Sequence, residues 1–324
     1  MIPVSPKKSL GQHFLADKNI AEKITGSLSG SGYNEVIEIG PGMGMLTQFL
    51  LENNNFTTSV VEIDRESAEY MRNRFPEISD KIHEVDFLNY PVNKNHSPPV
   101  AIIGNFPYNI SSRILFSILE NRAFVSEVVC MLQKEVAERI ASPPGTKIYG
   151  ILSVLIQAFY KTEYLFSVGP QVFVPPPRVK SAVLRLSRKP VFCLDCNEQL
   201  FFRIVKTAFN QRRKMLRNSL SVFLNGKKRS KDNLPGTYEN FRDKMNREKT
   251  ERKKINPEKT NTEQIDRQKT FQGNEKAEEL FSKRPEQLTF GDFVCLTNYI
   301  SPLLNNNGYY NDTPDNTVHD KTTS

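Results

Sequence analysis

The sequence predicts an α/β protein, with a wound sheet in the larger N-terminal part of the chain and a small helical domain after it. Between residues 34 and 188, short β-rich runs alternate with helical stretches, which is typical of one sheet and its covering helices. From Leu200 to Phe209, apolar residues instead recur at helical spacing, so one face of a helix is expected to be buried. A glycine-rich loop directly after the first predicted strand is the third observation.

The predicted strands are runs rich in β-branched residues, and the predicted helices lie between them. The strands are residues 36–39, 58–62, 82–85, 100–103, 125–131 and, late in the same sheet, 181–186. The helices are residues 45–52, 65–75, 111–121 and 133–140. Residues 148–160 are nearly all apolar but too few to span a membrane, so they are expected to form a buried helix. A further apolar helix is predicted from about 290 to 303.

Composition divides the chain into a first domain over residues 1–190, a second over residues 191–305 and a tail over residues 306–324. Within the second domain, residues 227–284 carry 17 Lys and Arg against 11 Asp and Glu, and their few apolar residues show no period. Such a stretch cannot bury enough apolar surface to offset chain entropy. We therefore predict a disordered charged insertion at about 227–284, and a similarly disordered tail.

The formal net charge of +8 favours a polyanionic partner, but most of this excess lies in the predicted insertion.

Cys193 and Cys196 have the spacing of half a zinc site, yet no second ligand pair lies near them in the sequence. We therefore expect free thiols in a reducing compartment and no bound metal. Residues 1–9 lack the apolar core of a signal peptide, so a cytoplasmic protein without membrane contact is expected.

The glycine-rich loop is Glu38-Ile-Gly-Pro-Gly-Met-Gly44, between the first predicted strand and a helix. Its glycines would let the backbone pass close to a bound nucleoside without a Cβ in the way. Dinucleotide enzymes place a related loop at the same point, so the loop alone does not choose a cofactor. Its G-x-G-x-G spacing, and the acidic Glu38 two positions before the first glycine, favour an adenosyl cofactor.

Two further acidic residues follow predicted strands. Glu62 ends the second strand, where a carboxylate can accept hydrogen bonds from both hydroxyls of a ribose; this fits NAD as well as S-adenosylmethionine. Asp86 follows the third strand and could accept a hydrogen bond from an adenine amine, although a helix cap or turn residue is the ordinary role of an Asp there.

The string Asn105-Phe-Pro-Tyr108, directly after the fourth strand, indicates the chemistry. An adenine N6 amine is a poor nucleophile because its lone pair is delocalised into the ring. The side-chain oxygen of Asn105 and the carbonyl of Pro107 could accept from its two N–H bonds and localise that lone pair, while Tyr108 stacks on the base. This chemistry depends on positioning and electrostatics and requires no strong base.

Six ordered motifs together resemble the KsgA family of small-subunit ribosomal RNA adenine dimethyltransferases, over roughly residues 7–225 and 284–303. They are Gly11-Gln-His-Phe-Leu15, Glu38–Gly44, Val61-Glu-Ile-Asp64, Asn105–Tyr108, Phe173–Ser181 and Phe209–Leu220. The resemblance implies a class I, Rossmann-like methyltransferase sheet that uses S-adenosylmethionine, with a small helical domain that binds rRNA. It also implies two methyl transfers to each of two adjacent adenosines, in a hairpin loop near the 3′ end of small-subunit rRNA within a pre-ribosomal particle. A monomer is expected.

Carried onto this chain residue by residue, the resemblance implies two sets of contacts. The cofactor contacts would be His13, Leu15, Gly40, Glu62, Asp86 and Asn105. The target-base contacts would be Asn105, Pro107, Tyr108 and Phe173, the last as a second stacking face. His13 stands where many bacterial members have Asn, and either side chain could form a hydrogen bond near the cofactor.

A basic cluster follows the first helix of the second domain. Its members are Arg212, Arg213, Lys214 and Arg217. Lys and Arg supply most of the affinity for nucleic-acid backbones, so the cluster could contact phosphates. The alternative interpretation is a solvent-exposed helix end without a binding role. The resemblance favours RNA contact for the cluster as a whole.

Three alternatives remain beside the small-subunit enzyme. A resistance-type dimethylase of large-subunit rRNA would share the cofactor loop and the Asn105–Tyr108 string, but segment 209–220 resembles KsgA. A DNA adenine methyltransferase would be expected to carry a base-reading module, and none is recognisable. A ribosome-assembly checkpoint without catalysis would not need the acceptors at Asn105 and Pro107.

Overall fold

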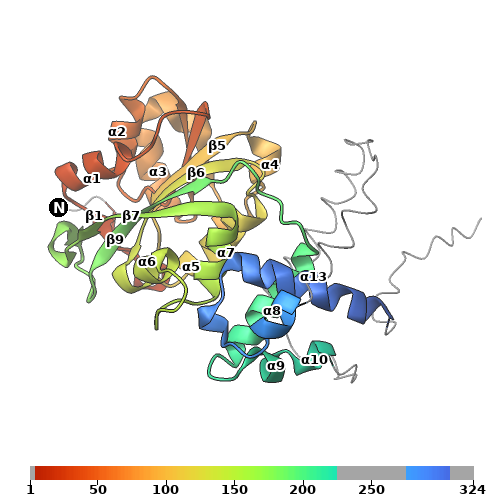
Figure 1. Cartoon of the computed structure of the whole chain (residues 1–324). Coiled ribbons are helices and arrows are strands. Elements are labelled where there is room, and N and C mark those ends of the chain that lie inside the picture. The colour runs from red at the N-terminus through yellow and green to blue at the C-terminus, as the bar shows by residue number, and fades with distance from the viewer. Residues whose placement is uncertain (1–3, 225–274, 307–324) are drawn as a thin grey trace, which may run out of the picture. The chain divides into compact units, whose positions relative to one another are not determined.

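The computed structural model describes residues 4–224 and 275–306. The predicted insertion up to residue 274, and the predicted tail from residue 307, lie outside the described residues. The described chain forms two compact units, the first ending at Leu194 and the second beginning at Asp195 (Figure 1). This boundary lies close to the predicted one at residue 190.

The first unit is built on a seven-stranded sheet in the order β4-β3-β2-β5-β6-β9-β7. The strands are β2 (Glu35–Ile39), β3 (Thr57–Glu62), β4 (Ile82–Glu84), β5 (Val100–Asn105), β6 (Val125–Gln133), β7 (Tyr160–Val168) and β9 (Ser181–Arg188). Neighbouring strands from β4 to β6 run parallel, and β9 runs antiparallel to both β6 and β7. This mixed sheet fits the predicted class I methyltransferase sheet.

Helices cover both faces of the sheet, with α1, α2 and α3 on one side and α5, α6 and α7 on the other (Figure 1). They are α1 (Lys18–Thr25), α2 (Thr47–Leu51), α3 (Arg65–Arg74), α4 (Val92–Asn95), α5 (Ser111–Glu120), α6 (Lys134–Ala141) and α7 (Ile151–Phe159). Because both faces are covered, the inner strands consist of nearly continuous apolar residues, and Ile102, Ile103, Val128 and Val129 are fully buried. This explains why their positions can be predicted from the sequence.

The sequence analysis missed three strands. Residues 160–168 form β7 at the edge of the sheet, although the predicted buried helix extends to residue 160. A separate pair joins β1 (Phe14–Leu15) to β8 (Phe173–Val174), with Leu15 opposite Phe173. No helix of the described residues is both long and apolar enough to cross a membrane.

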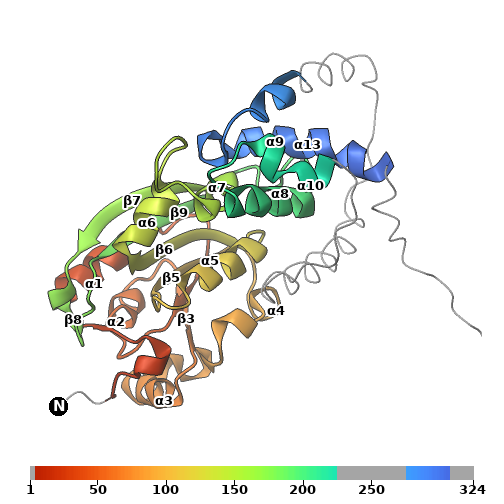
Figure 2. The same ribbon diagram turned by 90° about the horizontal axis from the view of Figure 1, so that it is seen from below.

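The second unit is helical, as Figure 2 shows for α8, α9, α10 and α13. Its helices are α8 (Glu198–Asn210), α9 (Leu216–Ser219), α10 (Ser221–Leu224), a helical segment at residues 275–280 and α13 (Phe290–Asn306). The apolar face of α8, including Phe201 and Ile204, is buried, as are Phe293 and Leu296 of α13. The predicted small helical domain is therefore present.

The predicted disorder is wrong over residues 275–284. Ala277 and Leu280 are buried in the second unit, and the carbonyls of Phe281 and Lys283 accept hydrogen bonds from the amides of Arg217 and Leu216, at 2.9 Å each. This segment has too few apolar residues to show a period, yet each of these two is fully enclosed by other elements.

Truncating Leu280 should therefore destabilise the second unit. Leu280→Ala should lower the free energy of unfolding by roughly 2–5 kcal/mol, because it deletes a buried side chain and leaves a cavity. Denaturant unfolding followed by circular dichroism measures the change. Glu278→Ala, which alters an exposed residue of the same segment, should stay within about 0.5 kcal/mol of wild type. Equal stability of the two variants would contradict burial of Leu280.

Candidate functional site

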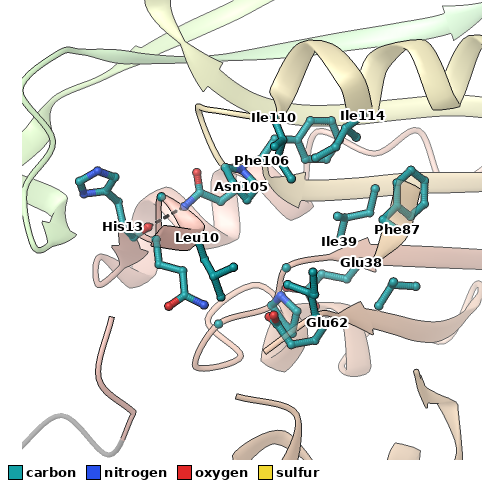
Figure 3. A pocket seen from close by; sticks show the side chains of 18 of the residues that line it. Leu10, His13, Glu38, Ile39, Glu62, Phe87, Asn105, Phe106, Ile110 and Ile114 are labelled. Carbon is teal, nitrogen blue, oxygen red and sulfur yellow. Dashed lines mark hydrogen bonds between the residues drawn. The ribbon is translucent and has the colours of Figure 1, made fainter. Parts of the chain in front are cut away.

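A pocket of about 280 Å³ opens at the carboxyl ends of β2, β3 and β5 in the first unit. Because these strands run parallel in adjacent positions, the loops that follow them lie at one edge of the sheet. Its volume is near the lower end of the range for small-molecule sites. Figure 3 shows side chains from the three strand ends, together with residues from the N-terminal segment, around one space.

The glycine-rich loop forms the floor of the pocket. Gly40 has a φ of +66°, and a Cβ built on it would meet no protein atom within 4 Å, so the backbone there faces open space. Glu38 begins the loop with only 1% of its surface exposed, and its Oε2 accepts a hydrogen bond from Thr47 Oγ1 at 2.6 Å. Burial raises the pKa of Glu38 to about 8, and nearby Glu62 adds to this, against the hydrogen bond from Thr47.

Glu62, at the end of β3, places a second buried carboxylate in the pocket. It is 4% exposed, and its Oε1 accepts a hydrogen bond from the Asp64 amide at 2.8 Å. Burial raises its pKa to about 7, although the backbone amides of Asp64, Gly42 and Ile63 oppose the shift. A carboxylate in this setting lacks the solvation it would have in water, so a ligand with hydroxyl donors would stabilise its charged form.

Asp86 lines the pocket after β4 and also caps a short helical turn. Its Oδ1 accepts a hydrogen bond from the Leu88 amide at 3.0 Å, and Phe87–Asn89 form the turn. Both roles considered for Asp86, a cap and a pocket acceptor, are compatible with this position. The turn also places Phe87 against the pocket.

Asn105 is the last residue of β5, and among the described residues its side-chain amide has one hydrogen-bond partner. Its Nδ2 donates to the backbone carbonyl of His13 at 2.8 Å, as the dashed line in Figure 3 shows. The opposite end of the amide, Oδ1, is therefore turned away from that carbonyl. A free amide oxygen is a hydrogen-bond acceptor with two lone pairs.

Tyr108 lies beside Asn105 and is held at its hydroxyl and over its ring. The hydroxyl lies 2.6 Å from Ser181 Oγ at the start of β9. The His13 ring stacks on the tyrosine at a centroid distance of 5.5 Å and an interplanar angle of 28°. His13 Nδ1 is in turn 2.8 Å from the carbonyl of Pro175. The orientation of the Tyr108 ring is thus fixed by the segments that precede β1 and follow β8.

The structure brings eight of the predicted site residues together around this pocket. They are His13, Leu15, Gly40, Glu62, Asp86, Asn105, Pro107 and Tyr108. Phe173 does not line it: its side chain is 2% exposed and packs in the hydrophobic core opposite Leu15.

The sequence analysis missed several apolar lining residues. Ile63 lines the pocket next to Glu62 and is 51% exposed, which is unusual for a large apolar side chain, while Leu10 and Phe87 line other walls. An apolar surface beside a buried carboxylate suits the face of a nucleoside's base. The signal that could have found Ile63 is its place directly after a strand, where its side chain no longer faces the sheet core.

The four members of the basic cluster in the second unit differ in their surroundings. Arg213, Lys214 and Arg217 are exposed after α8. Arg212 is partly buried, and its Nε lies 3.8 Å from Glu286 Oε2. Within the described residues, no three His, Cys, Asp or Glu side chains gather in a way that could hold a metal ion.

Residues 4–255 match the family model described as ribosomal RNA adenine dimethylase. Among curated proteins, ribosomal RNA small subunit methyltransferase A of Flavobacterium johnsoniae is 46% identical over 301 residues, which is 93% of this chain and 97% of the relative. The protein of the same name from Cytophaga hutchinsonii is 55% identical over 221 residues, covering 68% of this chain and 86% of the relative.

Two solved structures share the fold at lower sequence identity. A dimethyladenosine transferase from Plasmodium falciparum superposes with a TM-score of 0.64 at 22% identity, covering 91% of this chain and 98% of its own. The 23S rRNA methyltransferase ErmE gives a TM-score of 0.55 at 22% identity, covering 88% of this chain and 99% of its own. Both likenesses support the class I sheet and the helical second unit.

Replacing Glu38 by Gln should change how stability depends on pH. Burial raises the folded-state pKa of Glu38 from 4.5 to about 8, so the folded protein binds this proton more tightly than the unfolded chain does. The contribution of Glu38 to folding stability is therefore full at pH values below the pKa it has in the unfolded chain. It is lost as the pH rises through the pKa it has in the folded protein. Glu38→Gln should therefore gain stability relative to wild type, by up to a few kcal/mol, as pH rises through that window.

Calorimetric melting temperatures of both proteins, recorded from acidic to alkaline pH, measure this trend. Glu52→Gln serves as the control because it removes an exposed carboxyl at the end of α2. A stability difference between Glu38→Gln and wild type that did not change with pH, or that matched the control, would contradict a raised pKa of Glu38.

Proposed function

The chain belongs to the ribosomal RNA adenine dimethylase family, and from that premise we propose that it dimethylates two adjacent adenosines of small-subunit ribosomal RNA. The N6 amines acted on lie in a hairpin loop near the 3′ end of that RNA, and S-adenosylmethionine is the methyl donor. The curated relatives are named small-subunit methyltransferases, and one matches this chain over nearly the whole length of both. That full-length match favours the small-subunit substrate over the resistance-type large-subunit one.

The residues of the pocket fit S-adenosylmethionine. The Glu62 carboxylate is buried and forms no ion pair with a cation among the described residues, so ribose hydroxyls could donate to it. Gly40 leaves open space where a side chain would stand, and Ile63 and Phe87 offer apolar surface for the adenine near Asp86. Bound there, the cofactor supplies an electrophilic methyl group on its sulfonium. The chain's own groups hold and orient both reactants.

The orientation of the Asn105 amide is the observation that carries the proposal. Because Nδ2 donates to the His13 carbonyl, Oδ1 is free to accept from an amine in the pocket. The Pro107 carbonyl accepts from the Ile110 amide at 3.2 Å and retains a second lone pair for the same amine. Two acceptors on the two N–H bonds localise the nitrogen lone pair, which makes the amine nucleophilic without a strong base.

The same arrangement supports a second methyl transfer to the same nitrogen. Once the methylated amine has released one proton, one N–H remains, and a single acceptor can hold it. Tyr108, fixed by Ser181 and His13, keeps the base plane constant through both transfers. Stacking of a base on an aromatic ring contributes roughly 1–3 kcal/mol.

We place the RNA contacts of the second unit on Arg212, Arg213, Lys214 and Arg217, and the substrate within a pre-ribosomal small subunit in the cytoplasm. The three exposed members can meet phosphates directly, whereas Arg212 also has Glu286 beside it. A checkpoint protein without catalysis is disfavoured because the Asn105 acceptor is intact and oriented. Assembly surveillance by an active enzyme is compatible with the same contacts.

Asn105→Ala should lower methyl transfer by roughly 10²–10³-fold, the range seen when one group that stabilises a transition state is removed. The assay incubates the full chain with S-adenosylmethionine and unmodified small subunits, and detects methylated adenosines by mass spectrometry. Asn54→Ala, at an exposed asparagine outside the pocket, is the matched control. Wild-type turnover in Asn105→Ala, or no dimethyladenosine from the wild-type chain, would overturn the proposal.

Replacing Arg213, Lys214 and Arg217 together by Gln should weaken binding to small subunits and leave S-adenosylmethionine affinity unchanged. Each phosphate contact releases counterions, so the slope of log affinity against log salt should fall by roughly 2–3. Filter binding at several salt concentrations measures the slope. Arg212→Gln is the control, with a smaller expected change because Glu286 lies beside that guanidinium. An unchanged slope in the triple variant would place the RNA face elsewhere.

A further inference from the structure

Residues 7–16, which we call the N-terminal strap, form one wall of the cofactor pocket. Residues 9–15 all line it. The strap is fixed at its end by the β1–β8 pair and by the Ala16 amide, which donates to the Val172 carbonyl at 2.8 Å. In its middle, the His13 carbonyl accepts from Asn105.

Lys7 fixes the start of the strap. Its ammonium contacts the Asp64 carboxylate and lies 3.5 Å from Glu66 Oε2. Its backbone amide donates to Gln12 Oε1 at 2.8 Å, and Gln12 Nε2 reaches the other Asp64 oxygen at 3.5 Å. Two residues of the strap therefore converge on a single carboxylate.

Asp64, the carboxylate that holds the strap, is almost inaccessible to solvent. Its side chain is 3% exposed, against 40% for Lys7. Burial on its own would raise the pKa of Asp64, but the hydrogen bonds from Lys7, Gln12 and Ser67 outweigh it, and the pKa is lowered. Without Lys7, this buried charge would keep only the hydrogen bonds of neutral groups, which is an unfavourable state.

Asp64 also belongs to the cofactor site through its backbone. Its amide donates to Glu62 Oε1 at 2.8 Å, and Glu62 is the carboxylate proposed to hold the ribose. The contact between Lys7 and Asp64 thus connects the wall of the pocket directly to the segment that binds the ribose.

Few apolar contacts hold the strap before Phe14. None of residues 5–13 is buried, whereas Val4 before them and Phe14 and Leu15 after them are. Segments held by few apolar contacts open locally at lower free energy than core strands do. The polar contacts of Lys7, Gln12 and His13 therefore help to hold the stretch between these buried residues over the pocket.

We propose that Lys7 is a positioning residue that latches the N-terminal strap to Asp64 over bound S-adenosylmethionine and slows release of the cofactor. This inference rests on the proposed function, because it takes the pocket to hold that cofactor. Lys7 acts on the strap and not on the reacting atoms, so its loss should alter cofactor dissociation before it alters the methyl-transfer step.

The test measures dissociation of radiolabelled S-adenosylmethionine from the full chain, chased with unlabelled cofactor. Lys7→Met should speed dissociation by roughly tenfold, the effect of losing a charge-assisted hydrogen bond in a partly buried site. Association should change little. Lys8→Met is the matched control: Lys8 is the next residue, is exposed, and has no ion pair within the described part of the chain. Lys7→Arg should restore most of the wild-type rate.

Hydrogen exchange gives a readout independent of the cofactor. The amides of Leu10, Gly11 and Gln12 bond to the carbonyls of Lys7 and Lys8, and they should exchange faster in Lys7→Met than in Lys8→Met. Amides of β2 and β3 should be unchanged. Equal dissociation and exchange in Lys7→Met and Lys8→Met would overturn the latch, as would a change confined to association. If wild type bound no S-adenosylmethionine, the proposed function would fail instead, and the exchange result would still decide the latch.

Discussion

The site depends on the parallel register of β2, β3 and β5. Ile39 pairs with Val61, and Glu38 pairs with Ile103. The same edge of the sheet therefore holds the glycine-rich loop, Glu62 and Asn105, although the loop and Asn105 are far apart in the sequence. The Gly40 amide bonds to the Val61 carbonyl at 3.0 Å and holds the loop to β3 beyond the strand. A slip of one residue would turn Glu62 to the opposite face of the sheet.

The same edge concentrates groups that are costly to bury. Glu38 and Glu62 are both nearly inaccessible, and both have raised pKa values. A core built for stability alone would not place two carboxylates so close together. The cost is explained if a ligand completes their surroundings. Both carboxylates line the pocket, but Glu38 accepts a hydrogen bond from the Thr47 side chain, whereas Glu62 accepts hydrogen bonds from backbone amides. This difference supports the proposal that a ligand supplies hydrogen-bond donors to Glu62 and not to Glu38.

Sequence reasoning reached the parts of the molecule that are determined locally. Buried parallel strands are continuous apolar runs, and the motifs stand directly after them, so the sheet and most of the pocket residues could be predicted. The failures involve distant partners. Phe173 pairs with Leu15, remote in sequence, and is drawn into the core and not to the pocket. Residues 160–168 become an edge strand because β9 returns beside them, and Leu280 is buried although its own segment shows no apolar period. The expectations of a monomer, of free thiols and of a cytoplasmic location stay predictions.

The bond between Asn105 and His13 does not depend on the side chain at position 13. Asn105 is held by the backbone carbonyl of His13 and not by its ring. A flipped amide would set Oδ1 against that carbonyl and turn Nδ2 towards an incoming amine, so two repulsive contacts would replace two favourable ones. Any residue whose backbone follows the strap supplies the same carbonyl. The imidazole is then free for a separate task, stacking on Tyr108 while it contacts Pro175. The orientation of the Asn105 amide therefore depends on the path of the strap, whereas the side chain at position 13 contacts Tyr108 and Pro175.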